Sequence, residues 1–367
     1  MISKKRLGAL LLAGTMIMGM STTAFAAGTG TPTVGQSDNM YGAKASITKN
    51  LEMAEGLDVP DATFQFKVEK VTQDAPDASI QPIRYVARED KGTAGTDGKY
   101  IISKKSEIQF GEFPHAGEFA YRVTETKGQL ETITYSQEQY YLRVQVANTP
   151  MGNLYINTIT AEKDSEIGDD SKKVGEIVFT NTHRKNASLE IEKKTEGKLA
   201  DKTKAFEFEL TFTKSPTELQ DAPTYTGIIK DKKGNNVEGV SPVSVTVGKT
   251  TTFSLKDGQK LVFDSLPVGT KYVVTEKAVE KDGYTPKIQV LDNGISGQWH
   301  VGTEEGSLSS KDHFIGENGN KVMFVNTYND VPITGIIMNN LPFILLIGIA
   351  VLAFGTLAFL KKRRTSK

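Results

Sequence analysis

The sequence contains no cysteine and carries no net charge, because its 367 residues include 44 basic and 44 acidic side chains. Without cysteine the chain cannot form a disulfide or a thiolate metal site. Its four histidines, at widely separated positions, show no metal-ligand spacing. Nucleic-acid binding needs a basic surface, which a balanced charge does not favour. We therefore expect no cofactor, no metal site and no nucleic-acid partner.

The N-terminus has the pattern of a secretory signal peptide. Three basic residues at 4–6 precede an apolar stretch from 7 to about 20, and Ala24-Phe25-Ala26 follows it. A basic start, a short apolar run and an A-x-A site are typical of a segment that is removed on export, whereas the alternative is an uncleaved anchor. We assign residues 1–26 to the signal peptide and residues 27–41 to a flexible mature N-terminus.

The C-terminus combines a short motif with a membrane pattern. Val331-Pro332-Ile333-Thr334-Gly335 precedes an apolar run from about 341 to 360 and a basic tail. Such a run is long enough to cross a bilayer, and the basic tail marks the cytoplasmic side. The pentapeptide resembles the L-P-x-T-G signal that sortases cut between Thr and Gly, with Val331 in place of Leu. We expect sortase recognition at 329–335 and a transmembrane helix with its cytoplasmic tail at 336–367.

A sortase cut would join the carbonyl of Thr334 to an amine, which could belong to the cell wall or to another protein. The alternative for the same C-terminal pattern is a plain membrane anchor.

The body between the ends has the pattern of β-strands. Apolar and polar residues alternate at 63–68, 119–123, 141–144 and 206–212, and Gly, Pro, Asn and Asp lie between such stretches. No long stretch has helical periodicity. Alternation with a period of two indicates strands with one face in a core and one in water. The sequence predicts an all-β body built from sandwiches.

This body also repeats itself. Tyr121-Arg122-Val123-Thr124-Glu125 matches Tyr272-Val273-Val274-Thr275-Glu276, and 177–182 matches 322–327. A repeat of this length indicates two copies of one domain. We expect the first domain at 42–184 and the second at 185–328.

Each copy places three polar side chains on the apolar face of its strands. Residues two apart share a face, so a polar residue in phase with buried neighbours points inward. The alternative is that strands end at these positions and leave them at a wet rim. Agreement between the two copies favours burial, and parity selects Lys193 over the adjacent Lys194. The inward-facing residues are Lys49, Glu125 and Asn181 in the first copy and Lys193, Glu276 and Asn326 in the second.

Buried charges are tolerated only when they are paired or neutralised, and burial favours a free Lys amine and a protonated Glu. A free amine is a nucleophile. A protonated Glu can polarise an Asn by donating to its side-chain oxygen. Attack on that Asn would release ammonia and leave a Lys–Asn isopeptide bond, with the Glu moving protons.

These residues resemble the streptococcal-type shaft pilins, whose tandem Ig-like (CnaB-type) domains carry self-formed Lys–Asn isopeptide bonds. The matching motifs are Ile47-Thr48-Lys49-Asn50, Val123-Thr124-Glu125 and Phe179-Thr180-Asn181, with Glu192-Lys193-Lys194, Val274-Thr275-Glu276 and Phe324-Val325-Asn326 in the second copy. The resemblance spans residues 42 to 335. It implies that Lys49 is joined to Asn181 with Glu125 as catalyst, and Lys193 to Asn326 with Glu276.

The resemblance also implies an acceptor lysine for assembly, a few residues before the last strand of the first domain. The nearest match is Ser171-Lys172-Lys173-Val174, which departs from the family spacing by one residue. Lys173 is the first choice and Lys172 the second. The alternative is that both are ordinary surface lysines.

The sequence therefore predicts a structural subunit of a covalent pilus on the surface of a Gram-positive cell. Its expected partners are a sortase, neighbouring pilin subunits, and peptidoglycan at the base of the pilus. The alternative is a wall-anchored adhesin, or an ancillary tip or base pilin, that binds a host ligand. No catalytic set of a hydrolase is present in the sequence, so we expect no enzyme activity beyond the reaction of the chain with itself.

Overall fold

The computed structural model describes residues 42–95, 98–164, 172–278, 283–303 and 306–328. The expected signal peptide, sortase motif and transmembrane helix lie outside these residues. The described part contains strands β1 to β25 and no α-helix, which confirms the all-β prediction. No helix long and apolar enough to cross a membrane occurs in it.

The described chain divides into two compact units. Most of the first lies before Asn181 and most of the second after Thr182, while residues 52–59 and 91–101 are grouped with the second. Each unit holds two β-sheets, so the tandem arrangement expected from the sequence repeat is present.

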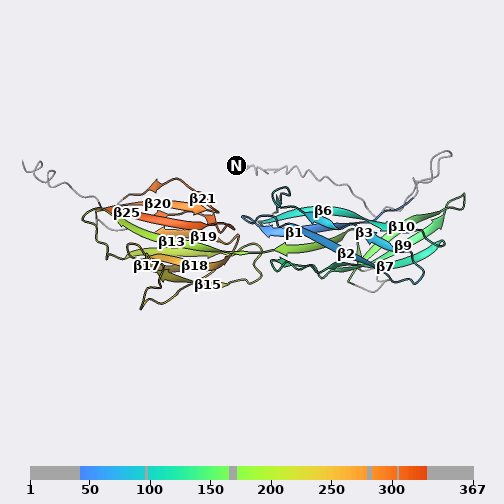
Figure 1. Cartoon of the computed structure of the whole chain (residues 1–367), viewed down its shortest axis with the longest axis horizontal. Coiled ribbons are helices and arrows are strands. Elements are labelled where there is room, and N and C mark those ends of the chain that lie inside the picture. The colour runs from blue at the N-terminus through green and yellow to red at the C-terminus, as the bar shows by residue number, and fades with distance from the viewer. Residues whose placement is uncertain (1–41, 96–97, 165–171, 279–282, 304–305, 329–367) are drawn as a thin grey trace, which may run out of the picture. The chain divides into compact units, whose positions relative to one another are not determined.

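Two six-stranded sheets belong mainly to the first unit, although their strand β5 falls in the segment 91–101 that is grouped with the second. In one sheet the order is β3-β6-β1-β12-β8, with β5 against β6, and in the other it is β11-β10-β9-β7-β2-β4. Figure 1 labels β1, β3 and β6 of the first sheet and β2, β7, β9 and β10 of the second. The strands are β1 (Ser46–Ala54), β2 (Ala62–Lys70), β3 (Ala78–Ile80), β4 (Ile83–Tyr85), β5 (Thr93–Ala94), β6 (Lys99–Phe110), β7 (Gly117–Thr126), β8 (Ile133–Thr134), β9 (Gln139–Asn148), β10 (Leu154–Lys163), β11 (Lys173–Val174) and β12 (Ile177–His183).

The second unit contains an eight-stranded and a five-stranded sheet. The larger sheet has the order β16-β15-β18-β13-β25-β20-β21, with β22 against β20, and the smaller has β17-β14-β19-β23, with β24 against β19. The strands are β13 (Asn186–Glu196), β14 (Phe206–Thr213), β15 (Thr224–Lys230), β16 (Val243–Thr246), β17 (Thr250–Leu255), β18 (Lys260–Pro267), β19 (Lys271–Glu276), β20 (Tyr284–Asp292), β21 (Ile295–Ser296), β22 (His300–Val301), β23 (Leu308–Ser309), β24 (His313–Phe314) and β25 (Asn320–Tyr328).

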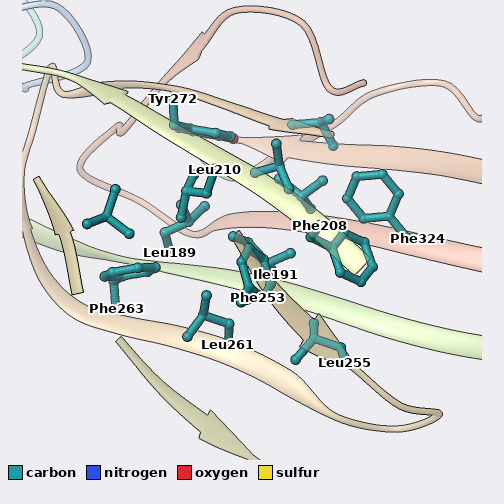
Figure 2. Close-up of a cluster of buried hydrophobic side chains, with 14 of the residues drawn as sticks. Leu189, Ile191, Phe208, Leu210, Phe253, Leu255, Leu261, Phe263, Tyr272 and Phe324 are labelled. Carbon is teal, nitrogen blue, oxygen red and sulfur yellow. The ribbon is translucent and has the colours of Figure 1, made fainter. Parts of the chain in front are cut away.

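The core of the second unit lies between its two sheets. Along β14 every second side chain from Phe206 to Phe212 is buried, as the alternating sequence predicts. Figure 2 shows buried hydrophobic side chains from the inner faces of the two sheets. The larger sheet supplies Leu189, Ile191, Leu261, Phe263 and Phe324, and the smaller supplies Phe208, Leu210, Phe253, Leu255 and Tyr272. Burial of these apolar side chains holds the sheets face to face.

Both units place their first and last long strands side by side. In the first unit β1 lies between β6 and β12, and in the second β13 lies between β18 and β25. The β13–β25 pair is parallel, and its register sets Lys193 opposite Phe324 and Thr195 opposite Asn326. This arrangement brings residues that are far apart in sequence onto one face.

Candidate functional site

The three polar residues of each unit come from both of its sheets. Lys49 on β1 and Asn181 on β12 belong to neighbouring strands of one sheet, while Glu125 on β7 comes from the other. The second unit repeats this plan with Lys193 on β13, Asn326 on β25 and Glu276 on β19. In each unit, the glutamate of one sheet therefore meets the lysine and the asparagine of the facing sheet.

All six side chains are buried, as strand parity predicts. The side chains of Lys49 and Glu125 are each 0% exposed, and those of Lys193 and Glu276 are 0% and 2% exposed. Both asparagines are fully buried. Lys194 points outward, which agrees with the choice of Lys193 as the inward-facing lysine.

In the first unit Glu125 joins the lysine to the asparagine. Lys49 Nζ donates to Glu125 Oε2 at 2.8 Å and to the backbone carbonyl of Phe179 at 3.3 Å. Asn181 Nδ2 donates to Glu125 Oε1 at 2.6 Å, and Asn181 Oδ1 accepts from the Ser136 backbone N–H at 2.7 Å. Each oxygen of the carboxyl and of the amide therefore has a donor.

In the second unit one carboxyl oxygen receives both partners. Lys193 Nζ donates to Glu276 Oε1 at 2.7 Å, and Asn326 Nδ2 donates to the same atom at 2.8 Å. The other carboxyl oxygen and Asn326 Oδ1 are buried without a hydrogen-bond partner among the described residues. The second site has the same three members as the first but fewer donors.

Phenylalanines enclose each lysine amine. Lys49 Nζ lies 4.7 Å from the ring centre of Phe64, and Lys193 Nζ lies 4.0 Å from that of Phe206. Two residues further along each strand, a second phenylalanine stands opposite the glutamate in the ladder: Phe66 in β2 and Phe208 in β14. These rings exclude water from the polar atoms.

Period-two alternation predicts both F-x-F stretches as strands but does not link them to the polar residues. The repetition of these stretches at similar positions in the two copies is the sequence signal that points to such a link.

Burial shifts the pKa values of the lysine and the glutamate in opposite directions. It lowers the pKa of Lys49 to about 8, although the charge and hydrogen bond of Glu125 oppose the shift. The pKa of Lys193 is also lowered to about 8 by burial, against the pull of Glu276. Burial raises the pKa of both glutamates. Each shift favours a free amine beside a carboxylate that accepts protons readily.

The orientation of the asparagine amide differs from the expectation. We expected a protonated Glu to donate to the amide oxygen, but Glu125 contacts Nδ2 instead. The physical reason is that the Ser136 N–H can only donate, so it takes the amide oxygen and leaves the NH₂ group for the carboxylate. In both units the glutamate contacts the amide nitrogen, which would leave as ammonia, and does not contact the amide oxygen.

The two candidate acceptor lysines lie at the edge of a sheet. Lys173 is exposed and begins β11, where it pairs in register with Glu162 of β10. Lys172 is also exposed and directly precedes the strand. No cluster of potential metal ligands occurs in the described residues.

Sequence comparison finds a family match for each unit, and the match of the first unit is to an isopeptide-containing domain. Residues 45–184 match the family model described as a Spy0128-like isopeptide containing domain. Residues 187–328 match a second family, described as a domain of unknown function (DUF7601).

Similarity to pilins extends over nearly the whole chain. The chain is 29% identical over 368 residues to a pilin of Streptococcus pyogenes serotype M1, and this alignment covers 95% of the chain and 98% of that pilin. A stretch of 88 residues is 36% identical to the pilus tip adhesin Cpa of Streptococcus pyogenes, covering 24% of this chain and 11% of that protein. This similarity to pilins confirms the resemblance stated from the motifs.

A solved structure of the major pilin from Streptococcus pyogenes is 24% identical, with a TM-score of 0.36. That comparison covers 78% of this chain and 98% of the other.

Proposed function

We propose that this chain is the repeating structural subunit of a covalent pilus and that it forms one Lys–Asn isopeptide bond in each unit. The observation that carries the proposal is the bridging carboxyl. In both units a single buried glutamate contacts the amine of a lysine and the amide of an asparagine. A buried lysine–glutamate ion pair alone would not require an asparagine beside the carboxyl in both units.

The bond forms by amide exchange. The lysine loses its ammonium proton, which a pKa of about 8 makes accessible near neutral pH, and the free amine attacks Cγ of the asparagine. The glutamate takes the proton that the attacking nitrogen must lose and delivers it to Nδ2. The Cγ–Nδ2 bond breaks, ammonia leaves, and the lysine nitrogen remains bonded to Cγ. Glu125 and Glu276 lie at the correct atom for this transfer, because each already accepts a hydrogen bond from Nδ2.

Such a bond suits a subunit that bears load. In the second unit the chain enters on β13 and ends, within the described residues, on the parallel neighbour β25. Tension between these points shears the two strands against each other. A bond from Lys193 to Asn326 would transmit the force directly and spare the loop of about 130 residues between them, whose closure is worth roughly 5 kcal/mol in the chain-entropy account developed for disulfides.

Assembly would use the ends of the subunit. A sortase would cut after Thr334 and join its carbonyl to Lys173 of the next subunit, with peptidoglycan as the final acceptor at the base. The exposure of Lys173 supports this role. The similarity to a pilin over nearly its full length supports a shaft subunit rather than a tip adhesin.

Intact mass tests the internal bonds. A mature body spanning both units is expected to weigh less than its sequence by two ammonia molecules, and Glu125→Ala is expected to restore one of them. A wild-type mass equal to that of the sequence would refute the proposal.

Wall extracts test the polymer. The wild type is expected to give a ladder of high-mass species that resists SDS, and Lys173→Arg is expected to remove the ladder while the subunit stays folded. Lys172→Arg is the matched control and is expected to leave the ladder intact. A single wild-type band would indicate a monomeric adhesin instead, and a ladder that persists in Lys173→Arg would assign the acceptor to another lysine.

A further inference from the structure

The second site contains three buried polar atoms that have no hydrogen-bond partner among the described residues. They are Glu276 Oε2, Asn326 Oδ1 and the hydroxyl of Thr195. In the first site the corresponding glutamate and asparagine oxygens are all paired. Buried polar groups are normally satisfied, so an unpaired group beside a reacting centre indicates a function.

Asn326 Oδ1 is the atom that most needs a donor during bond formation. When the amine attacks Cγ, negative charge develops on this oxygen, and a donor fixed in a water-excluded site stabilises that charge. Glu276 accepts the amide N–H as a carboxylate, and in that form it has no hydrogen to donate to the amide oxygen. In the first unit the Ser136 N–H already serves this purpose for Asn181.

Thr195 is placed to supply the missing donor. It lies two residues after Lys193 on the same face of β13, and it is 2% exposed. The register of the parallel β13–β25 pair sets Thr195 directly opposite Asn326. A turn of the Thr195 side chain to another χ1 rotamer can bring its hydroxyl toward the neighbouring Asn326 oxygen, and the hydroxyl hydrogen then rotates toward the charge that develops there.

The first unit has no equivalent hydroxyl. The residue two positions after Lys49 is Leu51, which is fully buried and has no donor. Each unit therefore has one candidate donor for the amide oxygen: a backbone N–H in the first and a threonine hydroxyl in the second.

We propose that the Thr195 hydroxyl stabilises the developing oxyanion on Asn326 while the second isopeptide bond forms. This inference rests on the proposed isopeptide chemistry. During the attack the C=O electron pair moves onto Oδ1, which accepts a hydrogen bond from Thr195, and it returns when the Cγ–Nδ2 bond breaks. Thr195 keeps its proton throughout, because Glu276 carries the proton from Nζ to the departing nitrogen.

The test follows both bonds in one molecule. The chain, recovered unfolded from inclusion bodies, is diluted out of denaturant and sampled over time. Proteolytic digestion and mass spectrometry then quantify the Lys49–Asn181 and Lys193–Asn326 linked peptides separately. Thr195→Val keeps the shape of the side chain and is expected to slow the second linkage by roughly 100-fold, as for the loss of one oxyanion donor, while the first linkage keeps its rate.

Two further variants separate catalysis from folding. Thr195→Ser retains the hydroxyl and is expected to restore the rate to near that of wild type. Thr327→Val removes a hydroxyl adjacent to Asn326 that bonds Glu196 instead, and it is expected to leave the rate unchanged. In an Asn326→Ala background, which cannot form the second linkage, thermal unfolding should show that adding Thr195→Val does not lower stability, because it removes an unpaired buried hydroxyl.

The outcomes distinguish the two proposals. If the wild type forms no Lys193–Asn326 linkage, the isopeptide chemistry of the second unit is wrong and this inference fails with it. If the wild type forms the linkage and Thr195→Val forms it equally fast, the inference alone is wrong.

Discussion

The two units arrange the same Lys, Glu and Asn in different polar surroundings. In the first, the lysine amine, the carboxyl and the amide make four hydrogen bonds, two of them to the backbone at Phe179 and Ser136. In the second, the corresponding groups meet only at Glu276 Oε1. The shared part is the lysine–glutamate–asparagine contact, which we take as the requirement of the chemistry. The differing part is the donor to the amide oxygen.

Removing the glutamate is expected to have the largest effect, because it belongs to the shared part. Glu276→Gln keeps the size of the side chain but cannot accept the proton, so the Lys193–Asn326 linkage should disappear completely. Glu125→Gln should abolish only the Lys49–Asn181 linkage, and peptide mass spectrometry measures both. Each variant serves as the control for the other, and loss of both linkages in either one would show that the units do not react independently.

Between pH 8 and 9.5, the stability of the second unit should depend more strongly on pH when its bond is absent. In Asn326→Ala, Lys193 remains a free amine whose folded pKa is about 8, below the unfolded value of 10.5. The unfolded state then binds more protons between these values, so stability rises with pH. From pH 8 to 9.5 we expect a gain of roughly 2 kcal/mol relative to wild type, in which an amide nitrogen does not titrate.

Trp299, the single tryptophan, lies in the second unit and reports its unfolding in denaturant by fluorescence. Asn181→Ala is the matched control, since it leaves the bond of the second unit in place and should follow the wild-type pH profile. Equal profiles for Asn326→Ala and wild type would contradict the lowered pKa of Lys193.

Much of this arrangement follows from the sequence. Period-two alternation predicts the strands, and the phase of Lys49 with its apolar neighbours predicts a buried amine. The donors could not be found in this way. The role of Ser136 belongs to its backbone N–H, which leaves no mark in the sequence, and Thr195 reads as an ordinary strand residue until the β13–β25 register sets it opposite Asn326.

The orientation of the asparagine amide was also beyond the sequence. It depends on which donors and acceptors surround the group in the folded chain. Parity places a side chain on a face of the sheet but does not say which of its two polar atoms meets the carboxylate.

The two units differ in the donor to the asparagine amide oxygen, and removing the backbone donor of the first unit tests this difference directly. Ser136→Pro lacks the N–H that Asn181 Oδ1 accepts, so the Lys49–Asn181 linkage should form roughly 100-fold more slowly. The Lys193–Asn326 linkage should keep its rate, and the refolding time course described above measures both. Ser136→Ala retains the N–H and should behave as wild type. A Ser136→Pro chain that folds and links at the wild-type rate would show that this hydrogen bond only positions the amide.

The pH dependence of linkage should be the same in both units, because burial lowers the pKa of both lysines to about 8. Only the free amine attacks, so each unit of pH below about 8 reduces its fraction, and the rate, by about tenfold, while the rate levels off above. Refolding at a series of pH values gives the two profiles from one sample. A rate that stays constant from pH 6 to 8 would contradict this, since the proton would then pass from lysine to glutamate without reaching solvent. Profiles that differ between the units would place the difference in the lysine–glutamate pair rather than in the donors Ser136 and Thr195.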